Sequence, residues 1–292
     1  MKRDWKSKHL FYHDIQQFDK LVIYLSKFMD KLVNQNQIEK YFYIRYWEGG
    51  PHIRLRYLVR DTQNFEIIDS MINKHVYKFW ENNPSTKLLT QTDYKKIYNE
   101  SVDNNGMMDK KLRKNATIEN IAYIPEIERY GGREALIVSE DLFCICSQIS
   151  TALLNVVDNY YYEKKFLFKI LLAFYIVFVF HNECGLTREE ILKMDSYAIN
   201  FWESKGVGID KKVWVFIQKN ITVIKNKIFW NKDFDVYIKK IHNLFFVIST
   251  LVSKEQYMGI VSSQIHMFAN RMGISPTIEV TMLHFFLREE SD

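Results

Sequence analysis

Residues 41–56 (YFYIRYWEGGPHIRLR) decide how the first part of this chain folds. Aromatic and β-branched residues dominate 41–47, and a Gly-Gly-Pro turn separates them from a second apolar run, which together predict a β-hairpin. Because side chains alternate along a strand, Arg54 and Arg56 share one face with His52. Two guanidinium groups on one face suit the binding of a carboxylate or a phosphate. Taken alone, the same pattern also describes a solvated arginine face on an ordinary hairpin.

The spacing of apolar residues in the rest of the chain predicts an α+β fold. Residues 1–132 are expected to form a mixed α/β part with an antiparallel sheet, and residues 133–292 to be mostly helical. Both parts are assigned to a single domain over 1–292. Residues 83–118 are largely polar, so we expect a partly ordered loop with short strands around it and a turn at 103–106 (DNNG). The other predicted elements are a strand at 9–12, the hairpin at 41–60, and helices at 18–32, 65–82, 133–158, 163–182, 187–203, 211–228, 233–252, 255–271 and 276–288.

The composition limits the classes of function that the chain can have. Its 292 residues are 47% hydrophobic and 26% charged, which is ordinary for a globular protein. The net charge of +5 is spread along the chain, without the dense basic patch typical of nucleic-acid-binding proteins. Three cysteines without metal-ligand or CxxC spacing predict free thiols and a cytoplasmic location. The most apolar run, 166–180, is shorter than the roughly 20 residues of a membrane span, so we expect a buried helix and no membrane insertion.

Two further segments carry residues that could do chemistry. The segment PEIERYGG places Glu126 and Arg129 just before a Gly-Gly turn, where a structural ion pair is the simpler reading. The segment HMFANRMG places His266 and Asn270 four residues apart, on one side of a predicted helix. A lone helical histidine is usually a core or surface residue, but a pKa near neutrality makes His266 the best candidate for proton transfer. The sequence contains no Gly-rich phosphate loop, HExxH or GxSxG motif, so no cofactor and no metal are expected.

Taken in order, four segments resemble the C-terminal domain of class I lantibiotic dehydratases, which is also found as separate thiopeptide-type bacteriocin biosynthesis proteins. The family pattern runs roughly as an aromatic-rich strand ending in IRY, then GPHxRxR, PExxRYGG and a late HMxxNRxG. The chain carries these motifs at residues 44–46 (IRY), 50–56 (GPHIRLR), 125–132 (PEIERYGG) and 266–273 (HMFANRMG). Four motifs in the right order are far more specific than any one of them.

The resemblance implies one half of a two-stage dehydration of Ser and Thr in a ribosomally made precursor peptide. In the family, an N-terminal domain transfers glutamate from glutamyl-tRNA to the hydroxyl group, and the C-terminal domain eliminates that glutamate, which is a lyase reaction. This chain matches only the eliminating domain. The expected partners are therefore the precursor peptide and a separate tRNA-dependent glutamylating protein, with no direct binding of tRNA.

The same resemblance assigns roles to five residues. Arg56, His266 and Arg129 are expected to be catalytic, and Arg54 and Glu126 to bind substrate. Arg54 and Arg129 would bind the glutamyl carboxylate, Arg56 would stabilise the developing charge, and His266 would transfer protons. Glu126 would orient an arginine or engage the glutamyl amine.

Two other functions remain open at this point. Pyridine synthases of thiopeptide pathways share the fold, but they join two dehydroalanines in a formal four-plus-two cyclisation, and they tend to lose the arginine and histidine set that this chain keeps. A non-catalytic scaffold that binds peptide is the second alternative, and it has no need of three converging arginines. The intact set therefore favours elimination.

Overall fold

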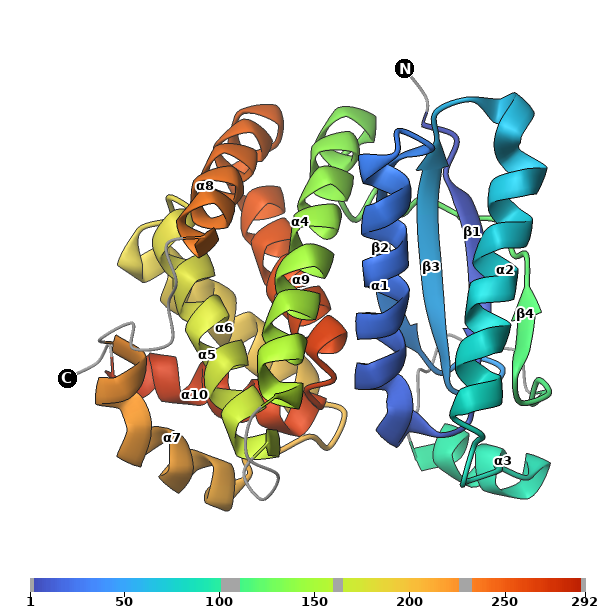
Figure 1. Cartoon of the computed structure of the whole chain (residues 1–292). Coiled ribbons are helices and arrows are strands. Elements are labelled where there is room, and N and C mark those ends of the chain that lie inside the picture. Colours follow the sequence, from blue (N-terminus) through green and yellow to red (C-terminus); the bar gives the residue numbers. More distant parts are fainter. Residues whose placement is uncertain (1–2, 101–110, 160–164, 226–232, 290–292) are drawn as a thin grey trace. The chain divides into compact units, whose positions relative to one another are not determined.

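The computed structural model (Figure 1) describes residues 3–100, 111–159, 165–225 and 233–289. The α+β fold is confirmed, since the sheet belongs to the N-terminal part and the rest of the described chain is helical. The chain divides into two compact units, Met1–Ile124 and Pro125–Asp292, which we describe separately. The sequence predicts the boundary between the two parts slightly later, after residue 132. That the whole chain forms a single family domain stays a prediction.

The first unit is built on a four-stranded sheet with the strand order β2-β3-β1-β4. All neighbouring strands pair antiparallel, and the predicted hairpin is formed by β2 and β3, with Tyr46 opposite His52 beside the turn. On β3, Arg54 lies opposite Ile44 of β2 and His9 of β1. The strands are β1 (Lys6–Phe11), β2 (Ile38–Tyr46), β3 (His52–Val59) and β4 (Thr117–Glu119).

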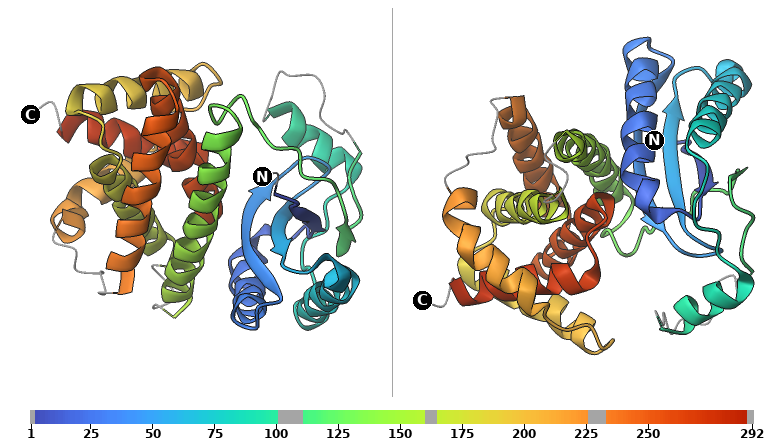
Figure 2. Two further views of the ribbon diagram at one scale, coloured as in Figure 1. Left: turned by 90° about the horizontal axis from the view of Figure 1, so that it is seen from above. Right: turned by 60° about the horizontal axis from the view of Figure 1, so that its bottom comes forward.

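Helices α1 (Phe18–Asn34) and α2 (Phe65–Asn82) lie side by side on one face of this sheet (Figures 1 and 2). Both helices fall where the apolar spacing predicts them. Ile53, Leu55 and Tyr57 of β3 are fully buried, and the Tyr57 hydroxyl donates a hydrogen bond to Asp69 of α2 at 2.9 Å. The odd-numbered residues of β3 therefore face the helices, and the even-numbered residues, including both arginines, face the other side.

A helix occupies part of the segment that was expected to be a loop. Within 83–118, residues Gln91–Glu100 form α3, so the prediction of a loop with short strands is wrong there. The Thr90 and Asp93 side chains bond to each other's backbone N–H at 3.1 and 3.0 Å, which is a reciprocal cap at the start of α3. That T-x-x-D spacing was a readable helix signal, but the polar composition of the segment obscured it. The predicted turn at 103–106 lies outside the described residues.

The second unit is helical in all of its regular elements among the described residues. Most predicted ends agree within two residues. Residues 163–164 of the predicted helix 163–182 and residues 226–228 of the predicted helix 211–228 lie outside the described part. Thr187 and Glu190 form a capping box before α6, and Pro276 opens α10, where its missing N–H costs nothing. The helices are α4 (Arg133–Asp158), α5 (Lys165–Glu183), α6 (Arg188–Glu203), α7 (Lys211–Lys225), α8 (Asp233–Leu251), α9 (Lys254–Met272) and α10 (Pro276–Glu289).

Helix α5 runs through the middle of the second unit, with α4, α7, α8 and α9 packed around it (Figure 2). By length and hydropathy, both α4 and α5 could span a membrane, but 61% and 72% of their apolar windows are buried in the structure. Such burial is what core helices of a folded protein show. The three cysteines are free, as predicted, and all three are buried.

Candidate functional site

The sheet face that α1 and α2 leave uncovered carries the two predicted arginines of the first unit. Arg54 and Arg56 extend from β3, with His9 of β1 and Phe42 of β2 as cross-strand neighbours on the same face. We call this surface the arginine face. The structure therefore brings Arg54 and Arg56 together, as the strand alternation predicts.

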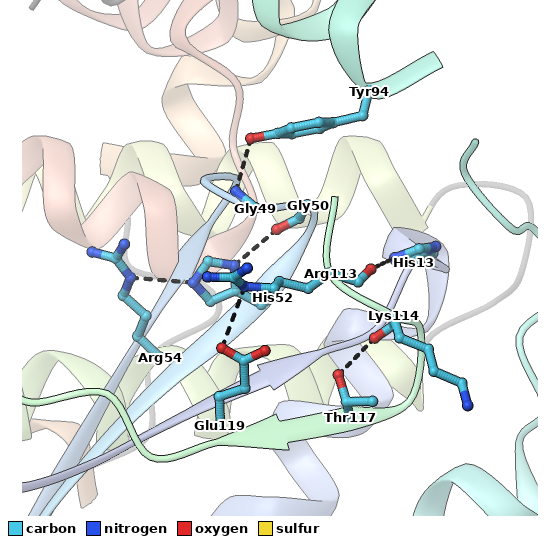
Figure 3. A network of polar contacts seen from close by, with 10 residues as sticks. All are labelled: His13, Gly49, Gly50, His52, Arg54, Tyr94, Arg113, Lys114, Thr117 and Glu119. Carbon is cyan, nitrogen blue, oxygen red and sulfur yellow. Dashed lines mark hydrogen bonds and ion pairs between the residues drawn. The ribbon is translucent and has the colours of Figure 1, made fainter. Parts of the chain in front are cut away.

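A turn between β2 and β3 sets the start of the arginine-bearing strand. Gly49 and Gly50 have φ angles of 76° and 110°, which favour glycine strongly. The Gly49 N–H donates to the Tyr94 hydroxyl at 2.7 Å (Figure 3). The Gly49 carbonyl accepts from the Arg113 N–H at 2.7 Å. A Cβ on Gly50 would lie 2.7 Å from a methyl group of Leu112. Helix α3 and the segment before β4 thus hold the turn in place.

Arg54 is held from three directions within the first unit. Its Nη2 donates to Glu48 Oε2 at 3.0 Å, and its guanidinium carbon lies 3.3 Å from the centre of the Tyr46 ring. Its Nε donates to His52 Nε2 at 3.2 Å (Figure 3). Burial lowers the pKa of Arg54 while Tyr46 and Glu48 raise it in part, but a guanidinium remains charged in proteins. Arg54 is therefore a fixed positive charge at a defined position.

The two histidines of the arginine face are neutral. Burial, together with the charges of Arg54 and Arg56, lowers the pKa of His9 to about 2 and that of His52 to about 3. His52 Nδ1 donates to the Gly50 carbonyl at 2.8 Å, which leaves its Nε2 as the acceptor for Arg54. His52 therefore links the turn to Arg54 and orients that arginine.

Arg56 lies deeper in the arginine face than Arg54. Only 5% of Arg56 is exposed, and its guanidinium carbon lies 5.4 Å from the centre of the Tyr123 ring. Tyr123 also contacts Phe42, the cross-strand neighbour of Arg56, with ring centres 6.0 Å apart. A charge in such an aromatic surrounding is poorly screened by water, so it acts strongly on a nearby anion.

The second unit brings together the other three predicted residues. Arg129 Nη1 donates to Glu126 Oε2 at 2.8 Å, so the ion pair that the sequence suggested is present. Arg129 Nε donates to Ser263 Oγ at 3.2 Å, although these residues are 134 positions apart in the chain. Ser263 lies one helical turn before His266 on α9. This contact joins the PEIERYGG segment to the helix that carries the histidine.

His266 is paired with a carboxylate that the sequence did not reveal. His266 Nδ1 lies 2.9 Å from Oε2 of Glu279 on α10, and the Glu279 side chain is only 3% exposed. Burial lowers the pKa of His266, but the Glu279 charge and hydrogen bond raise it more than Arg129 opposes, so the pKa lies above its ordinary value. A carboxylate at Nδ1 favours the tautomer whose Nε2 carries the lone pair, which is the arrangement of a general base. We call Glu126, Arg129, Ser263, His266 and Glu279 the histidine cluster.

Arg271 belongs to the same motif as His266 and has a structural role. It is fully buried, its Nε donates to Ser147 Oγ of α4 at 3.1 Å, and its Nη1 donates to the Met267 carbonyl at 2.8 Å. This side chain anchors α9 on α4. It therefore fixes the position from which His266 extends, without being part of the histidine cluster.

Tyr94, Ser263 and Glu279 hold the predicted residues in place, and sequence reasoning missed all three. The T-x-x-D cap at Thr90 would have placed Tyr94 on a helix. Glu279 lies in the first turn of a helix opened by Pro276. The sequence therefore predicts that Glu279 is helical, but it does not indicate that His266 is its partner. Across the described residues, no group of three or more His, Cys, Asp or Glu side chains is arranged to hold a metal ion.

Comparison with known sequences links the chain to one family of biosynthetic proteins. A family model described as lantibiotic biosynthesis dehydratase C-term matches residues 5–289. The epidermin biosynthesis protein EpiB of Staphylococcus epidermidis is 27% identical over 97% of this chain and 26% of that protein. The nisin biosynthesis protein NisB of Lactococcus lactis subsp. lactis is 25% identical over 85% of this chain and 22% of that protein. The chain thus spans about a quarter of the length of these relatives.

Two solved structures share the fold. The pyridine synthase TbtD from thiomuracin biosynthesis superposes with a TM-score of 0.73 at 12% identity, over 100% of this chain and 98% of that one. The tRNA-dependent lantibiotic dehydratase MibB from Microbispora sp. 107891 superposes with a TM-score of 0.64 at 13% identity, over 98% of this chain and 28% of that one. At these identities the likeness concerns the fold alone.

Proposed function

Because the chain belongs to the lantibiotic biosynthesis dehydratase C-terminal family, we propose that it eliminates glutamate from glutamylated Ser and Thr residues of a precursor peptide. The products are dehydroalanine or dehydrobutyrine and free glutamate, so the protein acts as a lyase. The arrangement of Arg129, Ser263, His266 and Glu279 is the observation that carries this proposal, because it places a paired histidine base beside an arginine. Both curated relatives described above are lantibiotic biosynthesis proteins, which supports the same reaction.

The chemistry explains why glutamylation must come first. Loss of hydroxide from Ser is difficult because the pKa of water is about 15.7. An ester of the glutamate α-carboxyl group instead releases a carboxylate whose acid has a pKa of about 3.5. The difference of about 12 pKa units corresponds to about 16 kcal/mol in leaving-group stability. What remains for the protein is to remove the Cα proton and to stabilise the negative charge that develops.

His266 is the base in this proposal. Its Nε2 takes the Cα proton of the glutamylated residue, the Cβ–O bond breaks, and glutamate leaves as a carboxylate while the proton stays on the imidazole. Glu279 stabilises the imidazolium so formed and keeps Nε2 in the accepting tautomer. Glu279 is thus a positioning residue that acts through His266.

The arginines supply positive charge for the two anions of the reaction. Arg56 is assigned to the enolate that forms when Cα loses its proton, and Arg54 and Arg129 to the carboxylate of the glutamyl group. Glu126 orients Arg129, as their 2.8 Å ion pair suggests. These assignments follow the family resemblance and await substitution experiments.

The partners follow from the same reaction. The ester must be supplied by a tRNA-dependent glutamylating activity, and the substrate is a ribosomally made precursor peptide. The eliminating step itself uses no tRNA and no cofactor, and we propose that it takes place in the cytoplasm.

A synthetic glutamylated peptide tests the proposal directly. Purified protein is incubated with the peptide in the absence of tRNA, and free glutamate and dehydroalanine are measured by mass spectrometry. Release of both supports elimination. If the ester stays intact while a peptide with two dehydroalanines is cyclised, the pyridine synthase reaction is the function instead. If neither peptide changes but both bind, the chain is a scaffold.

A further inference from the structure

Trp202, near the end of α6, lies against the proposed base, although the proposed reaction does not use it. The Trp202 side chain is half-buried, its ring centre is 5.2 Å from that of His266, and the two ring planes are tilted by 47°. Glu279 contacts the edge of the same imidazole, at Nδ1. Helix α6 packs against both α9 and α10, which carry His266 and Glu279. Three helices of the second unit thus meet at one imidazole.

The end of α6 holds the backbone of Trp202 in place. The carbonyl of Trp202 accepts from the Val207 N–H at 3.1 Å, and the carbonyl of Glu203 accepts from the Gly206 N–H at 2.9 Å. With a φ angle of 81° at Gly206, these are the two bonds of a Schellman motif. The Glu203 side chain in turn lies 2.9 Å from His284 of α10. The Trp202 ring therefore extends from a fixed position.

The groups that act on the charge of His266 come from neighbouring elements. Glu279 of α10 attracts the protonated imidazole, and Arg129 repels it. Glu203 of α6 is already paired with α10, and α6 contacts the imidazole through the Trp202 ring. An aromatic ring attracts a cation within about 6 Å of its centre, and the ring of Trp does so most strongly. Trp202 therefore favours the imidazolium form of His266 over the neutral form.

We propose that Trp202 is a positioning residue for the proton transfer: it holds the plane of the His266 ring and stabilises the imidazolium that forms when His266 takes up the Cα proton. Glu279 acts at the edge of the imidazole, and Trp202 acts through its ring. Because Trp202 works through His266, its loss should lower kcat and leave KM unchanged. The part in elimination rests on the proposed function, whereas the effect on the imidazole can be measured without any substrate.

NMR titration of the His266 imidazole tests the contact directly, with His266→Gln identifying the signal. Trp202→Leu fills the space without a ring, and Trp202→Met is a second ringless variant should Trp202→Leu not fold. Trp202→Phe keeps a ring, and Trp214→Leu removes a comparable ring on α7 that contacts Phe285 instead. The titration midpoint should move to lower pH in the ringless Trp202 variants, because the imidazolium loses a favourable contact. It should stay near the wild-type value in Trp202→Phe and Trp214→Leu.

The rate of glutamate release separates positioning from substrate binding. With a glutamylated peptide, kcat should fall about fivefold in Trp202→Leu at an unchanged KM, and Trp202→Phe should restore at least half of the rate. A raised KM would make Trp202 a substrate-binding residue and overturn the proposal. An unmoved midpoint in Trp202→Leu, or an equal move in Trp214→Leu, would overturn it as well. If wild-type protein releases no glutamate, the proposed function alone fails, and the titration still decides whether Trp202 acts on His266.

Discussion

The two groups of candidate residues differ in how firmly the fold holds them. In the first unit, Arg54 is fixed by Tyr46, Glu48 and His52, and Arg56 is 5% exposed. In the second unit, the Arg129 side chain is 43% exposed. Exposed ion pairs contribute little to stability and rearrange easily, whereas buried charges depend on their surroundings. The arginine face is therefore preorganised, whereas the exposed Glu126–Arg129 pair of the histidine cluster can adjust when substrate binds.

The largest expected effect on the rate of glutamate release comes from replacing His266, the proposed base. His266→Ala should lower the rate of glutamate release by about 10²–10⁴, the range of a lost general base. Because His266→Ala leaves the buried Glu279 carboxylate without its partner, the melting temperature should fall as well, and the rates are compared at a temperature at which the variant is folded. Single-turnover release from a glutamylated peptide gives the rate, and calorimetry gives the control. A rate within a factor of two of the wild type would remove His266 from the mechanism.

Arg56 shows the contrast in burial between the arginine face and the histidine cluster most clearly, because Arg56 is 5% exposed and the Arg129 side chain is 43% exposed. The burial of Arg56 against Tyr123 means that Arg56→Ala should lose activity and also about 2 kcal/mol of stability. This departs from the expectation for an exposed arginine, whose loss would spare the fold. Arg56→Lys keeps a positive charge without the fork and should lower the rate about 10²-fold with a smaller loss of stability. Chemical denaturation beside the rate assay separates the two effects, and a stable, active Arg56→Ala variant would contradict the account.

Glu279→Gln should change the pH dependence more than the maximum rate. The Glu279 carboxylate raises the pKa of His266, so its loss should move the acidic limb of the rate profile to lower pH. Because the pKa of His266 is higher in the folded protein, the pair stabilises the fold below about pH 6.5 and loses this contribution as pH rises through the folded-state pKa. The variant should therefore melt lower than the wild type mainly at acidic pH. An unshifted profile would show that Glu279 does not act through His266.

Replacing Glu126 should have the smallest effect on the rate of glutamate release among these substitutions. Its ion pair with Arg129 is exposed on both sides, so Glu126→Gln should cost about 1 kcal/mol at most, or about fivefold in rate. Ser263→Ala, which removes the hydrogen bond between Arg129 and Ser263, is the matched comparison. A loss of 10²-fold or more in Glu126→Gln would mean that this carboxylate contacts the substrate itself.

Elements with strong periodicity were predictable, and contacts between distant segments were not. Apolar spacing marked α1, α2 and most helices of the second unit, and strand alternation placed Arg54 and Arg56 on one face. The partner of His266 could not be predicted, because nothing in the spacing of α9 and α10 indicates that Glu279 faces it. The contact between Arg129 and Ser263 joins residues 134 positions apart, which only tertiary packing determines.

Glutamate release from a glutamyl-seryl peptide, with and without deuterium at Cα, tests the central claim most directly. The account predicts that wild-type protein releases free glutamate without tRNA, more slowly from the deuterated peptide because the Cα–H bond breaks in the chemical step. It predicts that His266→Ala releases glutamate about 10²–10⁴-fold more slowly under the same conditions. An intact ester after incubation with wild-type protein, or equal release by wild type and His266→Ala, would contradict it.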